Sequence, residues 1–575
     1  MKNVQVFCCA CILFIATHSY AFTAHQQLHY STYMGGSQND WISGLCTDET
    51  GNVYVTGTTS SGDFPFTSTI VSAQRLRGES DVFVAKFNRK GELLHCTLLG
   101  GCDYEGNSQI ALDPTGQIVV VGVTKSGDFP TTQDAFDRTY NGDCDVFVTK
   151  LNANINTILY STFLGGANQD HHPIVVVDDA GDIILCGPTR SSNFPTTDNA
   201  YDSSYNGTAE DGYYGDLFVA KFSAQGDRLL YSSFIGGKNE ETVFGIDCDS
   251  QGIVYLTGLT QSEDFPCQHS LYGGNYQGHR TDSHDAYVLG IDCERSTLVV
   301  STLFGGGRNE QGAEVEVCRD GSILVAGNTA SSDFPTTIGA FQSSYAGGGT
   351  SWKSGDLFVS RLDPSGKHFI YSTYVGGCGD EGWCDLAVDS QGNAWVGGGT
   401  SSSNFPTTEN ALDTTFNNGD NNFIYRDAFL FGLDPTGSRL LYATYLGGTG
   451  DDNVFKLDTD SRGNVTLGGL TISLDFPVAF NAYSAASRGQ RDAFVMTIRP
   501  LPQDGDPISI GHRRQFTSDI LGEERGLQIR LPRDYEQSDL AYPVLYCLDG
   551  EYSFVRLLTS ITNADGRLDV LVLNQ

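Results

Sequence analysis

The sequence lacks an apolar stretch long enough to span a membrane. Its most apolar segment, Val4–Ala16, is shorter than the roughly 20 residues that a transmembrane helix needs. This segment follows Lys2 and precedes Ser19-Tyr20-Ala21, the charged start and small-x-small end of a cleaved secretory signal. We therefore expect a signal peptide over residues 1–21 and a secreted product, periplasmic, extracellular or at the cell surface, with no membrane span.

Closely paired cysteines are missing from the mature chain. Twelve cysteines follow residue 21, and none of them forms a C-x-x-C pair, so the sequence gives no support for a zinc or dithiol redox site. In a secreted chain some of these cysteines could form disulfides, but their spacing does not fix a connectivity. We expect most of them to be single buried thiols.

Positive charge is scarce. The chain has 34 Lys and Arg against 69 Asp and Glu, which gives a formal net charge of −35. Such a chain is repelled by nucleic acid and by anionic membranes, so neither is expected as a partner. Many of the acids recur at fixed positions of an internal repeat, and the net charge therefore does not identify a cationic partner.

No segment before residue 500 keeps a 3.6-residue apolar period, and one unit is instead repeated seven times. SSNFPTT occurs at Ser191 and again at Ser402, and five looser copies give seven Phe-Pro pairs in all. A Gly-Gly pair begins 29 residues before each of these phenylalanines, whereas the spacing between copies varies from 65 to 71. The length variation therefore falls after Phe-Pro. The seven phenylalanines are Phe64, Phe129, Phe194, Phe265, Phe334, Phe405 and Phe476.

Each unit reads as four short strands joined by Gly-rich turns. One β-branched segment follows a polar turn whose glycine is expected to adopt a positive φ: Gly51, Gly116, Gly181, Gly252, Gly321, Gly392 and Gly463. A second segment opens with an aspartate: Asp81, Asp145, Asp216, Asp285, Asp356, Asp427 and Asp492. A third resembles YSTYLGG and leads into the Gly-Gly pair. A four-stranded repeat of this kind predicts a β-propeller blade.

The two ends of the repeat region predict how the ring closes. The chain begins with an unaccompanied YSTYMGG strand at Tyr30, and the last unit ends at DAFVMTIRP without such a strand. The N-terminal strand can therefore complete the seventh blade by pairing near Phe494, which removes an exposed sheet edge. We expect an all-β, seven-bladed propeller over residues 22–500.

The repeat resembles the SBBP-type bacterial β-propeller repeat in its combination of YSTYLGG, GNVYVTG, DFPTT and DAFV-like segments. The resemblance covers about residues 28–500 in seven copies. It implies the propeller fold and says almost nothing about a ligand.

An acid follows the first glycine of every Gly-Gly pair by five residues: Asp40, Glu105, Asp170, Glu241, Glu310, Glu381 and Asp452. These carboxylates could ring one mouth of the propeller and attract Ca²⁺ or a cationic ligand. Alternatively, and in keeping with their strict repetition, each accepts hydrogen bonds from nearby backbone amides. No other metal and no cofactor are expected.

The Phe-Pro pair is expected to serve the repeat itself, because proline ends a strand and the phenylalanine can plug the blade interface. Specific binding would then depend on the loops that follow, such as the Tyr- and Asn-bearing segments at residues 202–216, 342–356 and 413–427. They suit a polysaccharide or protein ligand. The His171-His172 pair has no recurring acidic or cysteine partner and is expected in a surface loop.

After Pro500 the repeat stops, and residues 501–508 read as a linker. Residues 509–575 alternate strand-like and helix-like segments, with two strands expected at Arg514–Leu521 and Gly526–Pro532. RLPRDY at Arg530 and YPVLYCLDGE at Tyr542 resemble the start of the enterochelin-esterase-like group of α/β-hydrolases. The resemblance implies a truncated hydrolase domain in which the amides near Gly550 and Glu551 would form part of an oxyanion hole.

A nucleophile is absent from that fragment. No G-x-S-x-G occurs in the chain, and His512 is the only histidine after Pro500, so no acyl transfer is expected from the chain as given. The sequence thus favours a secreted binding or scaffold module that is catalytically inactive. The alternatives are the N-terminal portion of a secreted esterase whose nucleophile-bearing part is missing, and a structural cell-surface repeat protein.

Overall fold

The computed structural model describes residues 27–67, 76–207, 214–272, 284–348, 355–417, 427–479 and 482–500, together with the backbone of two later strands, 513–518 and 523–528. The chain divides into two compact units, residues 1–502 and 503–575. The predicted signal peptide over residues 1–21 lies outside the described residues.

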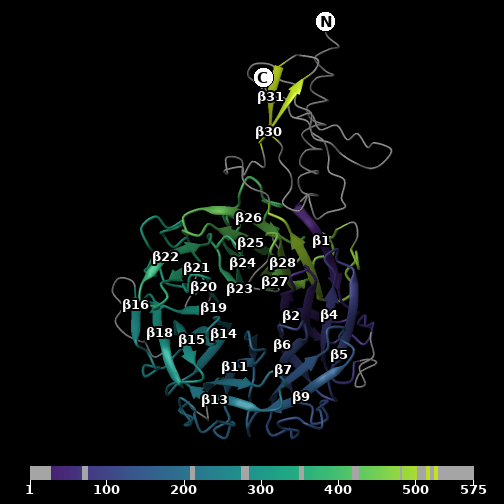
Figure 1. Ribbon diagram of the computed structural model, residues 1–575, viewed down its shortest axis with the longest axis vertical. Helices are drawn as coiled ribbons and strands as arrows, with labels where there is room; N and C mark the ends of the chain where they lie inside the picture. Colours follow the sequence, from purple (N-terminus) through teal and green to yellow (C-terminus); the bar gives the residue numbers. More distant parts are fainter. Residues whose placement is uncertain are drawn as a thin grey trace. The chain divides into compact units, whose positions relative to one another are not determined.

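The first unit is a β-propeller of seven sheets arranged around one axis (Figure 1). Each blade follows chain order from an inner strand to an outer strand, and its neighbouring strands are antiparallel. Blades 1 to 3 are β2 (Asp40–Thr47), β3 (Val53–Thr59), β4 (Asp81–Phe87) and β5 (Leu93–Leu99); β6 (Glu105–Leu112), β7 (Ile118–Thr124), β8 (Asp145–Leu151) and β9 (Ile158–Leu164); and β10 (Ile174–Val177), β11 (Ile183–Thr189), β12 (Asp216–Phe222) and β13 (Leu229–Ile235).

Blades 4 to 6 repeat the same order. They are β14 (Glu241–Cys248), β15 (Ile253–Thr260), β17 (Asp285–Asp292) and β18 (Thr297–Gly305), with an added β16 (His269–Tyr272); β19 (Glu310–Val317), β20 (Ile323–Thr329), β21 (Asp356–Leu362) and β22 (Phe369–Val375); and β23 (Glu381–Val388), β24 (Ala394–Thr400), β25 (Asp427–Leu433) and β26 (Leu440–Leu446).

The seventh blade joins the two ends of the repeat region. It consists of β27 (Asp452–Thr459), β28 (Val465–Thr471), β29 (Asp492–Ile498) and, as outer strand, β1 (Leu28–Met34). Tyr33 of β1 lies opposite Phe494 of β29. The expected closure by the N-terminal strand is therefore confirmed, and so is the all-β, seven-bladed architecture.

The turn between the first and second strands of each blade has the predicted conformation. The seven turn glycines adopt φ between 78° and 84°, a region that residues with a Cβ rarely occupy. In blade 1 the Asp48 carboxylate accepts hydrogen bonds from the backbone N–H groups of Thr50 and Asn52 at 3.0 and 2.9 Å. Asp48 thus fixes a tight turn, as expected for an aspartate in such a sequence.

Each Phe-Pro phenylalanine fills the space between neighbouring blades. All seven are only 2–4% exposed, and each ring lies 4.4–5.0 Å from an aromatic ring of the third strand in its own blade. Phe129 belongs to a core cluster that also contains Val82 and Val84 of the preceding blade. The prediction of a plug at the blade interface is confirmed.

The chain after Phe-Pro runs beside the outer strand of its own blade. In every blade the backbone N–H three residues after the phenylalanine donates to an outer-strand carbonyl at 3.0–3.1 Å, as Thr132 does to Ser161. In blade 4 this segment becomes β16, which pairs parallel with β18 and makes a fifth strand that the repeat pattern did not predict. Covering the outer edge in this way blocks sheet-to-sheet association.

The second unit contributes two described strands, β30 (Arg513–Ser518) and β31 (Glu523–Gln528), which pair antiparallel. They overlap the two strands expected in this region. The remaining hydrolase-like segments, with Gly550 and Glu551, lie outside the described residues.

Two expectations about the whole chain can be compared with the part that is described. There, no helix is long and apolar enough to cross a membrane. The eleven cysteines within these residues are all free thiols, and five of them are buried.

Candidate functional site: the loop face and the blade joints

One face of the propeller carries both the Gly-Gly turns and the Phe-Pro loops. In each antiparallel blade the turn precedes the first strand and the loop follows the second strand, so both lie at the same end of the sheet. We call this end the loop face. The stretch from the Phe-Pro phenylalanine to the third-strand aspartate varies between 16 and 22 residues, whereas the stretch from there to the next Gly-Gly pair varies by one residue, so most of the length variation of the propeller lies on this face.

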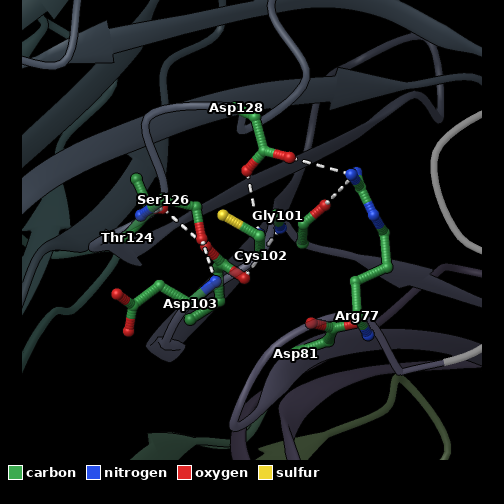
Figure 2. Close-up of polar contacts among 10 residues, drawn as sticks. Arg77, Asp81, Gly101, Cys102, Asp103, Thr124, Ser126 and Asp128 are labelled. Carbon is green, nitrogen blue, oxygen red and sulfur yellow. Dashed lines mark hydrogen bonds and ion pairs between the residues drawn. The ribbon is translucent and has the colours of Figure 1, made fainter.

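A hydrogen-bond network explains why S-x-[D/N]-F-P is repeated seven times. The serine Oγ accepts a backbone N–H of the Gly-Gly turn at 2.8–3.0 Å in all seven blades. The Asp or Asn before the phenylalanine accepts the preceding N–H of the same turn at 2.7–3.0 Å. Figure 2 shows these contacts in blade 2, where Ser126 binds Asp103 and Asp128 binds Cys102. The sequence reading missed both roles, although the repetition of the two polar positions was a visible signal.

The seven acids after Gly-Gly lie at the start of the inner strands and are fully buried, with exposed fractions of 0–1%. Each accepts the N–H of the second glycine at 2.7–3.2 Å. A threonine hydroxyl at the end of the second strand also donates to the acid, at 2.6–2.8 Å for Glu105, Glu241, Glu310 and Glu381. These contacts tie the inner strand to the Phe-Pro loop.

Burial strongly affects the ionisation of these acids. It raises the pKa of Asp40 to about 6, that of Glu105 to about 7 and that of Glu310 to about 8, despite the hydrogen bonds from Thr, Ser and Gly that lower it. A nearby aspartate of the preceding blade raises the pKa further, Asp81 in the case of Glu105.

That aspartate is the first residue of the third strand. In six blades its Oδ2 accepts a backbone N–H from the Phe-Pro loop at 2.5–3.1 Å. Its Oδ1 faces the acid of the next blade, with the first glycine of Gly-Gly beside both. We call this arrangement a blade joint. Six joints have both acids beside the glycine: Asp492–Asp40, Asp81–Glu105, Asp145–Asp170, Asp216–Glu241, Asp285–Glu310 and Asp356–Glu381. In the seventh, Asp427–Asp452, Asp452 lies beside Gly447 and its charge raises the pKa of Asp427.

The observed contacts are those of the hydrogen-bond alternative for the seven acids. Within the described ranges, no group of three or more His, Cys, Asp or Glu side chains is gathered as a metal ion requires. The calcium ring therefore has no support from the arrangement of these side chains.

A charged cluster joins the inner strands of three blades. The Lys456 ammonium of β27 lies 2.7 Å from Asp385 of β23 and 2.9 Å from Glu314 of β19. The Asp385 carboxylate also accepts the N–H of Leu457 at 2.7 Å. Glu316 lies near the same acids, and burial together with their charge raises its pKa well above the usual value. Negative charge thus predominates around this lysine.

Trp383 stands out on the loop-face end of β23. Its side chain is 64% exposed, its backbone adopts φ 52°, and its ring meets that of Phe455 of β27 edge-on at 6.1 Å. Asn107 and His172 occupy the equivalent position in blades 2 and 3, also with positive φ. A non-glycine residue in this conformation costs roughly 1–3 kcal/mol and is often found at a functional site. The sequence reading did not single out Trp383.

The histidine pair lies outside the strands, as expected of a loop, but His171 is buried. His171 is only 7% exposed, and its ring stacks on that of Tyr214 at 5.5 Å. The pair lies between the isolated bridge of Asp170 with Thr189 and the start of β10 at Ile174, and His172 is half-buried with φ 46°.

The longest Phe-Pro loops are described only in part. Residues 208–213, 349–354 and 418–426, which include Trp352, lie outside the described residues. The described part of the loop face is therefore the Gly-Gly turns, the Phe-Pro motifs and the inner-strand ends.

Comparison with known proteins agrees with this architecture. Residues 29–65 match the family model of the SBBP beta-propeller repeat. This segment is the first copy of the unit, from the YSTYMGG strand to the first Phe-Pro, and the other six copies share its landmarks. The resemblance to this repeat is thus supported, whereas that of the C-terminal fragment to an esterase is not.

A curated relative is the regulatory protein FlaEY of Caulobacter vibrioides, which is 24% identical over 343 residues. The match covers 57% of this chain and 34% of FlaEY, so it spans about a third of the relative's length.

Solved structures with a similar fold include a protein of unknown function from Dyadobacter fermentans and a polysaccharide lyase described as an ulvan lyase. The former is 10% identical with a TM-score of 0.38, covering 69% of this chain and 95% of that chain. The latter is 11% identical with a TM-score of 0.42, covering 77% and 93%.

Proposed function

We propose that this chain is a secreted binding or scaffold module whose ligand is held on the loop face, near Trp383. The observation that carries the proposal is the combination of a repeated scaffold with length variation concentrated on one face. The Phe-Pro plugs and the joint acids repeat in all seven blades, whereas the loops on that face differ in length and sequence. Binding residues commonly lie on loops that a rigid scaffold positions.

Trp383 supports a ligand near the axis of this face. Its large ring is exposed although apolar groups normally favour burial, and its backbone is held in an unfavourable conformation. Aromatic side chains of this kind anchor polysaccharides and protein surfaces. The acidic composition disfavours an anionic ligand.

A panel of soluble neutral, amino-bearing and anionic polysaccharides tests this proposal by affinity electrophoresis and tryptophan fluorescence. We expect retardation of the wild-type chain by at least one member of the neutral or amino-bearing group, and its loss in Trp383→Ala. Ile370→Ala is the matched control, because Ile370 is 51% exposed on the outer strand β22, away from the loop face. If Trp383→Ala bound the polysaccharide as well as the wild type, Trp383 would not be part of the binding site. If no polysaccharide retarded the wild-type chain, a protein ligand would become the favoured alternative.

The second candidate is an N-terminal portion of a secreted esterase, which the motifs at Arg530 and Tyr542 favour. The propeller would then serve as a targeting domain. The DNA downstream of residue 575 decides between the two: an open frame that continues into G-x-S-x-G and a late histidine favours the esterase. We expect the chain as given not to hydrolyse p-nitrophenyl esters, and Ser-dependent turnover would contradict this.

A further inference from the structure

The blade joints place two carboxyl groups side by side without a charged partner between them. From the position that a Cβ on Gly165 would occupy, Asp145 Oδ1 and Asp170 Oδ2 are both 2.8 Å away. The corresponding distances at Gly236 are 2.5 Å to Asp216 Oδ1 and 2.7 Å to Glu241 Oε2. Each aspartate belongs to the third strand of one blade and each facing acid opens the next blade, so the pair lies at the seam between two blades.

One oxygen of the third-strand aspartate is left without a hydrogen-bond donor. In five joints, as far as the structure describes the chain, Oδ1 is buried without a hydrogen bond of normal geometry, whereas Oδ2 of the same carboxyl accepts a backbone N–H; the five residues are Asp81, Asp145, Asp216, Asp356 and Asp427. In four of them a second backbone N–H also approaches the carboxyl and lowers its pKa, that of Gly78, Gly142, Gly207 or Gly347. These side chains are fully buried. A buried carboxylate oxygen that lacks a donor is strongly unfavourable, and the same unfilled position recurs around the ring.

The charged groups around the joints are mostly further acids. The charge of Asp137 raises the pKa of Asp145, and the charges of Asp202 and Asp264 raise that of Asp216. The charge of Asp380 likewise raises the pKa of Asp356, and the charges of Asp413 and Asp451 raise that of Asp427. Two ionised carboxylates would thus repel one another in a setting that is already negative.

The Asp81–Glu105 joint differs because Arg77 lies nearby. Its guanidinium lies 2.8 Å from Asp128 (Figure 2). Its backbone N–H donates to Asp81, and its charge lowers the pKa of Asp81. Of the five joints, this one is therefore the least favourable for an un-ionised carboxyl group.

We propose that each of these five joints binds one proton at neutral pH, carried on the facing oxygen of one carboxyl and donated as a hydrogen bond to the other. The proton comes from solvent, one group becomes a neutral carboxylic acid, and its partner stays a carboxylate. The hydrogen fills the position at Oδ1 that lacks a donor, and the repulsion between the two groups disappears. Five proton-binding sites would then lie between neighbouring blades.

The direction of the pKa shifts agrees with this arrangement. Burial raises the pKa of Asp145 to about 6, that of Asp170 to about 7 and that of Asp427 to about 8, although hydrogen bonds lower all three. A nearby acid adds to each rise: Asp137 for Asp145, Asp145 for Asp170 and Asp452 for Asp427. A group whose pKa is higher in the folded than in the unfolded chain stabilises the fold at low pH. That stabilisation is complete below the unfolded pKa of about 4 and is lost as the pH rises through the folded values.

Infrared spectroscopy and thermal unfolding of the purified chain test the proposal. We expect the C=O band of un-ionised carboxyl groups to be present at about pH 7, where ordinary carboxylates have lost it. We also expect Tm to fall by about 5 °C or more between about pH 6 and about pH 9. Absence of the un-ionised band at neutral pH would overturn the proposal, even if every variant failed to fold.

The triple variant Asp145→Asn, Asp216→Asn and Asp427→Asn isolates the joints. An asparagine can keep its carbonyl oxygen at the Oδ2 position, where the backbone N–H donates, and place its NH₂ at Oδ1, where it donates to the facing acid. We expect this variant to melt above the wild type at about pH 9, to lose much of its pH dependence and to weaken the un-ionised band. Asp198→Asn, at an exposed position of a Phe-Pro loop, is the matched control and should change none of these.

Two further results would overturn the inference. A triple variant destabilised equally at about pH 6 and about pH 9 would show that the aspartates act only through their shape and backbone contacts. A rise in Tm on adding CaCl₂ at about pH 9 that EDTA reverses and the triple variant lacks would show that a metal ion, and not a proton, occupies the joints.

Discussion

Tyr33, in the first described strand, lies opposite Phe494 in the last strand of the propeller. Its hydroxyl donates to the carbonyl of Ser473 at 2.7 Å and accepts the N–H of Phe476 at 3.1 Å. One side chain therefore connects the N-terminal strand to the Phe-Pro plug of the seventh blade, across 443 residues of chain.

Replacing Tyr33 should destabilise the whole ring. The side chain is 1% exposed, so Tyr33→Ala leaves a cavity and two unsatisfied backbone groups, at a cost of roughly 3–5 kcal/mol. Urea unfolding followed by far-UV circular dichroism measures this. His29→Ala, at an exposed position of the same strand, is expected to change the free energy of unfolding by less than about 0.5 kcal/mol. Similar values for the two variants would contradict closure through β1.

Gly100, the first glycine of its Gly-Gly pair, is required by the neighbouring acids and not by a positive φ. A Cβ at Gly100 would lie 2.4 Å from Asp81 Oδ1 and 2.8 Å from Glu105 Oε2. Gly100→Ala should therefore force the two carboxyl groups apart and destabilise the fold by about 1–3 kcal/mol. The control is Gly127→Ala in the same blade, where the nearest atom, Cδ1 of Tyr140, would lie 4.0 Å from the added Cβ. Equal Tm values for the two variants would show that the two carboxyl groups can move apart to accommodate the added methyl group at no cost in stability.

Loss of a Phe-Pro plug should be more costly than loss of an exposed ring in the same blade. Phe129 is 3% exposed and stacks on Phe147 at 4.4 Å, whereas Phe136 is 39% exposed. We expect Phe129→Ala to lower the free energy of unfolding by about 3–5 kcal/mol and Phe136→Ala by far less. Denaturant titration of both variants measures the difference, and comparable losses would mean that the plug does not hold the blades together.

The acidic limb of the stability profile depends on different carboxylates. Burial alone would raise the pKa of Asp113, but Lys150 at 2.8 Å, Thr115 and the N–H of Gln117 hold it below its usual value. A lowered pKa stabilises the fold above the unfolded value of about 4, and this contribution is lost as the pH falls below it.

Asp113→Asn should remove that contribution and leave Lys150 buried without its partner. We expect a loss of roughly 3–5 kcal/mol at neutral pH, since both side chains of the pair are at most 7% exposed, and a smaller loss near pH 3. Thermal unfolding against pH records this, with Asp134→Asn as the exposed control. A pH-independent difference would show that the ion pair does not matter.

The periodic part of the fold could be predicted because its causes are local. The turn at Gly51, the strand that opens at Asp81 and the plug at Phe64 depend on a few neighbouring residues, and seven copies make each pattern unmistakable. The unpaired strand at Tyr30 also predicted the closure, since the last unit lacked its outer strand. The fifth strand β16 was missed, because only packing against β18 makes that loop segment extended.

The candidate site was predicted much less completely. The seven acids were found, but their burial and their pairing with the aspartates of the preceding blade depend on how two blades meet. The burial of His171, which was expected in a surface loop, also depends on this packing. The exposure of Trp383 cannot be predicted from the repeat pattern.

By itself, the sequence determined the blade and the number of blades, because each blade is built from short-range turns, alternating strands and one repeated plug. Only the tertiary structure decided which side chains of neighbouring blades face one another across a seam. The reason is that these contacts arise when the ring closes, and burial at the seam then decides whether a carboxyl group is charged, paired or protonated.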